Sequence, residues 1–305
     1  MDSFNKAFSI GNAALSWNAV MLALGILTAV VVSEIIVKKR KLYKDLALDA
    51  CIVGIPAGLL GGRLFAAISG KIAFSEFFEL SRVGLNLPGA LLFVAVGITV
   101  YAKIKKLSIS EMLDALAPGA CFGLAVGRWS DFFLCEGLGP AAGAGVPKFF
   151  PLVTFTRAYF QDGKTVAYAV FFLDFLVCAA LGVLALILLK KKSRGTAIRV
   201  AATTYLFAEF ILEWLRDGST RQIVFGEVRF NQIVLLAMLL VTIAVSLRFA
   251  KRQGEPAQKE AEPEPADAAE APEEPEESDE PDGSEEPEKP EEPEEPEESA
   301  ERTEA

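Results

Sequence analysis

The sequence of 305 residues contains no histidine and only four cysteines. The absence of histidine removes both the commonest general base and the commonest metal ligand. The cysteines include no CxxC pair, and three of them fall within long apolar stretches: Cys51, Cys121 and Cys178, with Cys135 as the fourth. Neither a disulfide framework nor a zinc site is therefore expected, and the sequence indicates no metal and no cofactor.

Residues 253–305 lack aromatic and β-branched apolar side chains and carry 3 basic against 24 acidic residues. Glu-Glu-Pro units repeat in this segment, as at Glu273–Pro275 and Glu291–Pro293. Such a segment cannot bury enough apolar surface to offset its ordering entropy, so we predict a disordered acidic tail. It serves either as a solvated, repulsive extension or as a site for a basic partner. Nothing in the charge pattern indicates nucleic-acid binding.

Residues 1–252 have the opposite balance, with 27 Lys and Arg against 16 Asp and Glu, and are rich in apolar stretches. Each stretch is close to the ~20 residues that a helix needs to cross ~30 Å of hydrocarbon. We predict an all-α, polytopic membrane helix bundle, with seven transmembrane helices favoured over six or eight. The predicted spans are 13–37, 45–68, 87–102, 111–128, 166–189, 198–215 and 230–248.

Basic clusters follow the first, third, fifth and seventh predicted spans, as at Lys38–Lys41 and at Lys103, Lys105 and Lys106. Positive charge next to spans marks the cytoplasmic side. The N-terminus is therefore expected outside and the C-terminus in the cytoplasm. The first span is not expected to be a cleaved signal peptide, because its apolar run is too long and its positive charge follows the run.

Several charged and polar residues interrupt these spans, and their spacing places them on common helix faces. They are Asp49 and Arg63 in the second span, Asp114 and Arg128 in the fourth, Asp174 in the fifth, and Tyr205, Glu209, Glu213 and Arg216 in the sixth. A charge at membrane depth costs at least ~2.5 kcal/mol, so these side chains should avoid lipid. We predict that they face a polar interior shared by the second, fourth, fifth and sixth spans.

Arg128 stands at the outer end of the fourth span, in a stretch that also holds Asp131 and Glu136. A permanently charged guanidinium next to lipid is most simply explained if it holds something anionic at the bilayer surface. Glycines at spacing four, such as Gly119, Gly123 and Gly127, are expected to serve close helix packing instead.

The segment 127–139 resembles the signature of the bacterial prolipoprotein diacylglyceryl transferase family. Further similarities follow in order along the body of the chain, whereas the acidic tail lies outside them. The matching residues are Gly127, Arg128, Phe132, Glu136 and Gly139 in the signature, then Gly61-Gly62-Arg63, Asp114 with Pro118, Tyr205 with Glu213 and Arg216, and Gln232 at the start of the last span.

This resemblance implies transfer of a diacylglyceryl group from phosphatidylglycerol to the lipobox cysteine thiol of a lipoprotein precursor, whose signal peptide holds it in the plasma membrane. The partners implied are membrane lipid and lipoprotein precursor signal peptides, and seven helices can enclose such a site as a monomer. We expect catalytic roles for Arg128, Glu136 and Glu209. The expected substrate-binding residues are Arg63, Asp131, Gly139, Tyr205, Glu213, Arg216 and Gln232.

Several positions depart from the family pattern. The family's His-Gly-Gly is Pro88-Gly89-Ala90, and its second essential arginine is Glu209. One hypothesis is a divergent transferase in which Arg128 holds the phosphate and Glu136, Asp131 or Glu209 replaces the histidine as base. The alternative is a scaffold that binds lipid or signal peptide without turnover, or serves a different substrate. A transporter or assembly scaffold is a third class, without the internal inverted repeat expected of a transporter.

Overall fold

The computed structural model describes residues 5–10, 13–78, 84–190, 194–217, 223–225 and 228–254. The chain divides into two units, Met1–Pro256 and Ala257–Ala305. The acidic tail predicted for 253–305 lies outside the described residues from position 255 onward. All features below belong to the first unit.

Long helices form most of the described chain, and three two-stranded antiparallel ribbons accompany them. The long helices are α1 (Trp17–Lys39), α2 (Leu46–Ile68), α3 (Leu87–Ile104), α4 (Ile109–Gly127), α7 (Val170–Leu189), α8 (Thr196–Leu215) and α9 (Phe230–Gly254). The short helical elements are η2 (Phe74–Glu76), α5 (Trp129–Leu134) and α6 (Tyr159–Asp162). The ribbons pair β1 (Lys6–Ile10) with β2 (Ala13–Ser16), β3 (Val153–Phe155) with β4 (Val166–Tyr168), and β5 (Ile223–Phe225) with β6 (Val228–Arg229).

Six of the described helices are long and apolar enough to cross a membrane: α1, α2, α3, α4 continued by α5, α7, and α9 as far as Phe249. Helix α8 has 20 residues but carries Arg199, Glu209 and Glu213 within them. The polytopic membrane helix bundle predicted from the sequence is thus confirmed. The seventh span and the sides on which the two termini lie stay predictions.

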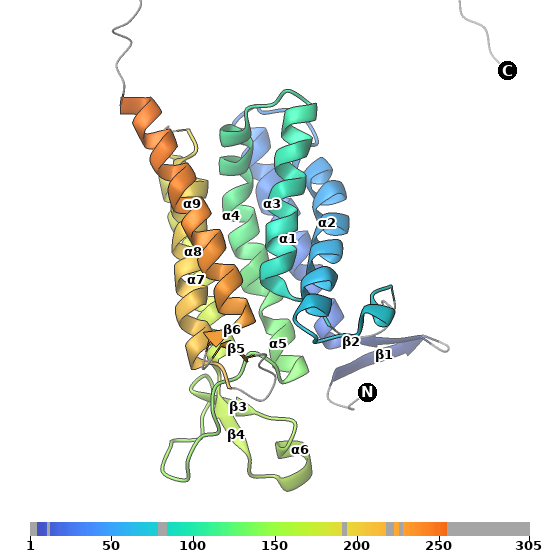
Figure 1. Cartoon of the computed structure of the whole chain (residues 1–305). Coiled ribbons are helices and arrows are strands. Elements are labelled where there is room, and N and C mark those ends of the chain that lie inside the picture. Colours follow the sequence, from blue (N-terminus) through green and yellow to red (C-terminus); the bar gives the residue numbers. More distant parts are fainter. Residues whose placement is uncertain are drawn as a thin grey trace, which may run out of the picture. The chain divides into compact units, whose positions relative to one another are not determined.

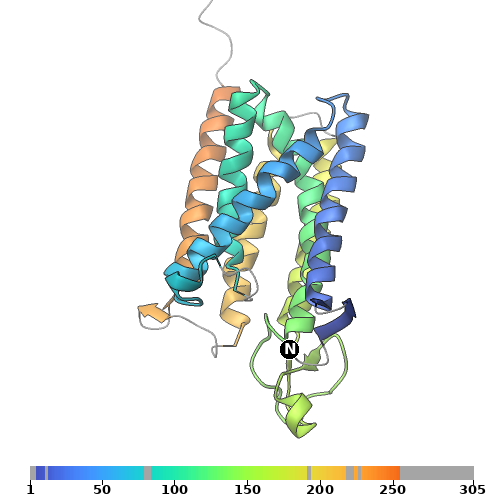
Figure 2. The same cartoon turned by 90° about the vertical axis from the view of Figure 1, so that its right-hand side faces the viewer.

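The long helices lie side by side, and the short strands, α5 and α6 gather at one end of them (Figures 1 and 2). Helix α4 packs against α1, α7 and α8, while α2 packs against α3. The close approach of α4 to α1 depends on Gly119 and Gly123, which face Ala29 and Ser33 of α1. Gly127, the third glycine at this spacing, has open space where a Cβ would lie.

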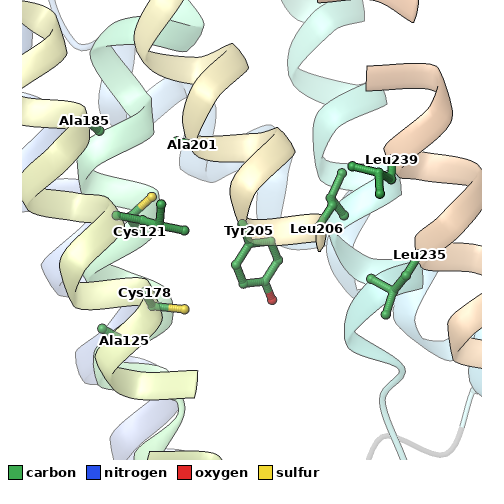
Figure 3. Close-up of a cluster of buried hydrophobic side chains, with 10 residues drawn as sticks. Cys121, Ala125, Cys178, Ala185, Ala201, Tyr205, Leu206, Leu235 and Leu239 are labelled. Atoms are coloured by element: carbon green, nitrogen blue, oxygen red, sulfur yellow. The ribbon is translucent and has the colours of Figure 1, made fainter. Parts of the chain in front are cut away.

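One apolar core cluster of the bundle lies where α4, α7, α8 and α9 meet (Figure 3), and a second lies among α1, α2, α3 and α4. Cys121 of α4 and Cys178 of α7 are buried in the first cluster as free thiols, and Leu206 of α8 and Leu235 of α9 belong to its other side. Tyr205 belongs to the same cluster, but its hydroxyl reaches a charged neighbour, Arg128. The core therefore borders directly on a polar region.

The loop before β4 is held by Asp162, which lies outside the membrane-spanning segments. Its carboxylate accepts hydrogen bonds from the Thr165 hydroxyl and from the backbone N–H groups of Lys164 and Thr165. These bonds, that of the Thr165 side chain first, lower the pKa of Asp162 to about 2. The ionised form thus supports the turn that leads into the β3–β4 ribbon.

Asp114 caps the start of α8 from the neighbouring helix α4. Its Oδ2 accepts from the Gly195 backbone N–H (2.6 Å) and its Oδ1 from that of Ile198 (2.8 Å). The Asp114→Ala variant is expected to lose about 1–2 kcal/mol of stability, because a cap at a helix N-terminus satisfies otherwise unpaired N–H groups. Thermal unfolding of the purified protein in detergent measures this.

The matched control is Glu111→Gln on the same helix. Glu111 pairs with Arg194, whose side chain is 74% exposed, and exposed pairs contribute little to stability. The control should leave the melting temperature nearly unchanged. Equal shifts for the two variants would contradict a capping role for Asp114.

A buried charged cluster as the candidate functional site

Helices α4, α7 and α8 bring charged side chains together at the end of the bundle where the ribbons lie. Arg128 follows the last residue of α4, Asp174 stands in the first half of α7, and Glu209 and Glu213 share one face of α8. Arg216 follows α8 directly. We call the charged cluster the set Arg128, Asp131, Asp174, Glu209, Glu213, Arg216 and Arg229.

Arg128 is buried among carboxylates of its own chain. Its Nη2 lies 2.7 Å from Glu209 Oε2 and 3.2 Å from the Tyr205 hydroxyl. Its Nη1 lies 3.5 Å from Asp131 Oδ2 and 3.8 Å from Asp174 Oδ2. Only 7% of the side chain is exposed. The sequence predicted a guanidinium that faces the bilayer surface, whereas the structure surrounds it with internal counter-charges.

Arg216 is the second centre of the charged cluster. Its Nη2 lies 2.5 Å from Asp174 Oδ2 and 2.9 Å from Glu209 Oε1, and its Nη1 lies 2.8 Å from Glu213 Oε2. Glu209 and Asp174 therefore each lie between the guanidinium groups of Arg128 and Arg216. Such a desolvated network is stable only because its charges are paired and hydrogen-bonded.

Arg229, at the end of β6, is a member that the sequence analysis missed. Its guanidinium is buried, lies 3.8 Å from Glu213, and donates to the backbone oxygens of Trp214 and Arg216. The available signal was an arginine directly before the apolar run of α9. With it, the charged cluster holds three arginines and four carboxylates.

Some buried polar atoms in and beside the charged cluster have no hydrogen-bond partner among the described residues. They are Nε of Arg128, Nε of Arg216, Oδ1 of Asp174 and Nε2 of Gln232. Gln232 is held through its Oε1, which accepts from the Arg229 backbone N–H at 3.0 Å. Buried polar groups normally have partners, so these atoms are candidate contacts for a polar ligand.

The charges of α2 do not join the charged cluster, which corrects the predicted polar interior of four spans. Arg63 donates instead to the backbone oxygens of Glu76 (2.8 Å), Phe77 (3.1 Å) and Gly84 (3.5 Å), and so holds the segment that follows α2. Asp49 accepts from the Tyr101 hydroxyl at 2.5 Å. The spacing of charged residues along a helix shows which of them share a face. It does not show which neighbouring helix or loop that face packs against.

The signature segment turns sharply after α5. Cys135 and Gly137 have positive φ angles of 51° and 63°. Glu136 lies at this turn, with Oε2 at 3.5 Å from Lys71 Nζ. Gly139 donates to the Tyr168 oxygen (2.8 Å), and a Cβ there would lie 3.0 Å from the Tyr168 side chain. Gly139 thus allows close approach of two backbones, next to rather than within the charged cluster.

Taken together, fold and site define a membrane-embedded helix bundle with an internally compensated cluster of arginines and carboxylates. A family model described as "Prolipoprotein diacylglyceryl transferase" matches residues 5–248. The chain belongs to this family, as the resemblance of the signature segment predicted. It is a multi-pass protein of the bacterial plasma membrane.

Two relatives illustrate the similarity. A phosphatidylglycerol–prolipoprotein diacylglyceryl transferase of Clostridium kluyveri is 26% identical over 245 residues, which cover 78% of this chain and 93% of the relative. A protein of the same name from Clostridium botulinum is 26% identical over 262 residues, covering 81% and 97% of the two chains. The matched region thus includes nearly all of the relatives.

Proposed function

We propose that this protein transfers a diacylglyceryl group from phosphatidylglycerol to the lipobox cysteine thiol of lipoprotein precursors, acting as a monomer. The observation that carries this proposal is the family match over residues 5–248, which spans every arginine of the charged cluster. In the reaction, the thiol sulfur bonds to the glyceryl carbon and the carbon–oxygen bond to phosphate breaks. Glycerol phosphate leaves with the bonding electron pair, and the thiol proton passes to a base.

Arg128 and Arg216 are the groups that we assign to the departing phosphate. Fixed guanidinium groups in a desolvated site stabilise developing negative charge more strongly than water does. Both are held in place by the chain's own carboxylates, with Tyr205 orienting Arg128 and Glu213 orienting Arg216. The Gln232 side-chain oxygen accepts from the backbone N–H of Arg229, and the Arg229 guanidinium in turn donates to the backbone oxygen of Arg216.

We assign the thiol proton to Glu136 rather than to Glu209 or Asp131. Each oxygen of Glu209 is engaged by a different guanidinium, so this residue serves as a counter-ion in the resting protein. Asp131 lies beside Arg128 in the same way. Glu136 lies at the rim, 32% exposed, where its neighbour Lys71 is 3.5 Å away. A precursor thiol can approach a carboxylate at that position, as base catalysis requires.

Gly139 and Arg63, the remaining predicted substrate-binding residues, hold the segments of Glu136 and Lys71 in place beside the charged cluster. Gly139 brings the signature segment against Tyr168, and the Asp217 backbone N–H donates to the Leu138 oxygen at 2.8 Å. This contact ties the segment of Glu136 to the end of α8, next to Arg216. Arg63 donates to the backbone oxygens of Glu76 and Phe77, in the same segment after α2 that carries Lys71.

Complementation tests the proposal in cells. The full chain is expressed in bacteria depleted of their own transferase, and a reporter lipoprotein is assayed for lipid modification, with the C. kluyveri relative as positive control. The expected result is a modified reporter. If the chain inserts into the membrane while the reporter stays unmodified, transfer is excluded. Phospholipid or signal peptide co-purified with such an inactive chain would establish the alternative of binding without turnover.

A further inference from the structure

Lys71 stands on a fixed turn at the end of α2. Gly70 is left-handed there, with φ 63°, and the Lys71 backbone N–H donates to the Ala66 oxygen at 2.8 Å. This arrangement is a Schellman motif, in which a left-handed residue ends a helix. Ile72 anchors the turn, because it is only 6% exposed and belongs to the same apolar cluster as Ala66. The backbone position from which the lysine side chain extends is thus well defined.

Glu136 occupies the equivalent place at the end of α5. Cys135 is the left-handed residue, with φ 51°, and the Glu136 backbone N–H donates to the Asp131 oxygen at 2.9 Å. The side chains of the two turns meet: Lys71 Nζ lies 3.5 Å from Glu136 Oε2, although 65 residues separate them in the sequence. Two helix ends thus present a cation and a carboxylate to each other.

This pair is open enough to admit a third group. The side chains of Lys71 and Glu136 are 39% and 32% exposed. Their separation also exceeds the roughly 2.7–2.9 Å of a strong charged hydrogen bond. Exposed pairs of this kind contribute little to stability, so the fold does not depend on the contact. A thiol that arrives at the rim of the site can therefore lie against both side chains.

Lys71 is the basic side chain that stands next to the proposed base. The other charged or titratable side chains on the described segments around the pair are Arg63, Glu76, Asp131, Cys135, Arg157 and Asp217. Both arginines among them donate to backbone oxygens, Arg63 after α2 and Arg157 at the end of α5. A negative charge that develops beside Glu136 therefore meets the ammonium group of Lys71 first.

Such a cation has a chemical purpose in this reaction. The thiolate, not the thiol, is the nucleophile, and a neighbouring lysine favours the thiolate. A carboxylate is in general a much weaker base than a thiolate, with reference pKa values of about 4.3 and about 8.5. Proton transfer from a thiol to a carboxylate is therefore unfavourable unless the thiolate is stabilised. The chain contains no histidine that could take the proton instead.

We propose that Lys71 stabilises the thiolate of the lipobox cysteine while Glu136 takes its proton, so that the two residues activate the acceptor together. The inference rests on the proposed transferase function and adds a catalytic residue to it. The sulfur anion pairs with the ammonium group of Lys71, which keeps its three protons. The sulfur then bonds to the glyceryl carbon and the carbon–oxygen bond breaks. Glycerol phosphate leaves with the electron pair, towards Arg128 and Arg216.

The test measures transfer rates with the purified full chain in dodecyl maltoside micelles that contain phosphatidylglycerol, with a lipobox peptide as acceptor. Lys71→Met is expected to modify the peptide about tenfold more slowly at pH 7, which corresponds to one unit in the pKa of the bound thiol. The deficit should shrink between pH 7 and pH 9, because the thiolate then forms without help. Lys71→Arg should keep most of the rate. Lys148→Met, which removes an exposed lysine between α5 and β3, should keep all of it.

A second acceptor separates activation of the thiol from folding and from lipid binding. A selenol is more acidic than a thiol, so the selenocysteine form of the peptide is already ionised at pH 7. Its modification should be nearly as fast with Lys71→Met as with the wild type. If Lys71→Met does not fold, Lys71→Gln provides the same comparison.

Undiminished transfer to the cysteine peptide by the folded Lys71→Met variant would overturn the inference and leave the proposed function intact. An equal loss with both peptides and at every pH would also overturn it, since Lys71 would then act on the lipid or on the fold. Absence of transfer by the wild type would overturn the proposed function itself, and the inference with it.

Discussion

Replacement of Arg128 by alanine is expected to reduce diacylglyceryl transfer by about 10²–10³-fold, the usual cost of removing a donor that stabilises transition-state charge. The variant removes the guanidinium nearest to Glu209 and leaves this buried carboxylate and Asp174 to Arg216 alone. Unpaired buried charge also destabilises the fold, so the rate must be measured on folded protein. The measurement is the initial rate of peptide modification, normalised to monodisperse protein.

Two further variants separate catalysis from folding. Arg128→Lys keeps a positive charge but loses the bidentate hydrogen bonding of the guanidinium. Its transfer rate should stay low, although the variant should be more stable than Arg128→Ala. Arg194→Ala removes an exposed arginine that also pairs with a carboxylate, Glu111, and should retain the wild-type rate. A folded Arg128→Ala protein with undiminished transfer would show that Arg128 has no part in the chemistry.

Gly119→Ala is expected to destabilise the bundle more than any other single methyl group added along α4. A Cβ at this position would lie 2.5 Å from the Ala29 oxygen, and closer still to the Ser33 hydroxyl. Backbone atoms of α1 cannot rotate away, so α1 and α4 must separate. We expect a loss of about 1–3 kcal/mol, the range for overpacked cores, seen as a lower melting temperature in detergent.

Gly127→Ala provides the matched control on the same helix. A Cβ there meets nothing within 4 Å, although the residue has the same spacing in the sequence. Its melting temperature should stay close to that of the wild type. A similar loss for both variants would mean that helix propensity or lipid contact, rather than the contact between α1 and α4, determines the effect.

The helices could be predicted from the sequence because lipid imposes a simple rule on their composition. Every predicted span coincides with a long helix, including 198–215 with α8. Two predicted spans begin too early, at residues 13 and 166. The structure has β2 and β4 at these positions, before α1 and α7 begin. The residues there are as apolar as those of the helices, so hydrophobicity alone cannot separate a short ribbon at the end of the bundle from the first turn of a span.

The candidate site could be predicted only along single helices. The spacing of Tyr205, Glu209 and Glu213 correctly placed them on one face of α8. That Glu209 meets Arg128, 81 residues away in sequence, depends on how α4 and α8 pack. Arg229 was missed because it ends a two-residue strand, in which no periodicity marks a buried face.

The most direct test of the account is mass spectrometry of a lipobox peptide incubated with the purified chain and phospholipid. The peptide is expected to gain the mass of one diacylglyceryl group on its cysteine, in a thioether that withstands reducing agent. A peptide that stays unmodified, while the C. kluyveri relative modifies it under the same conditions, would contradict the assignment of transferase activity to this protein.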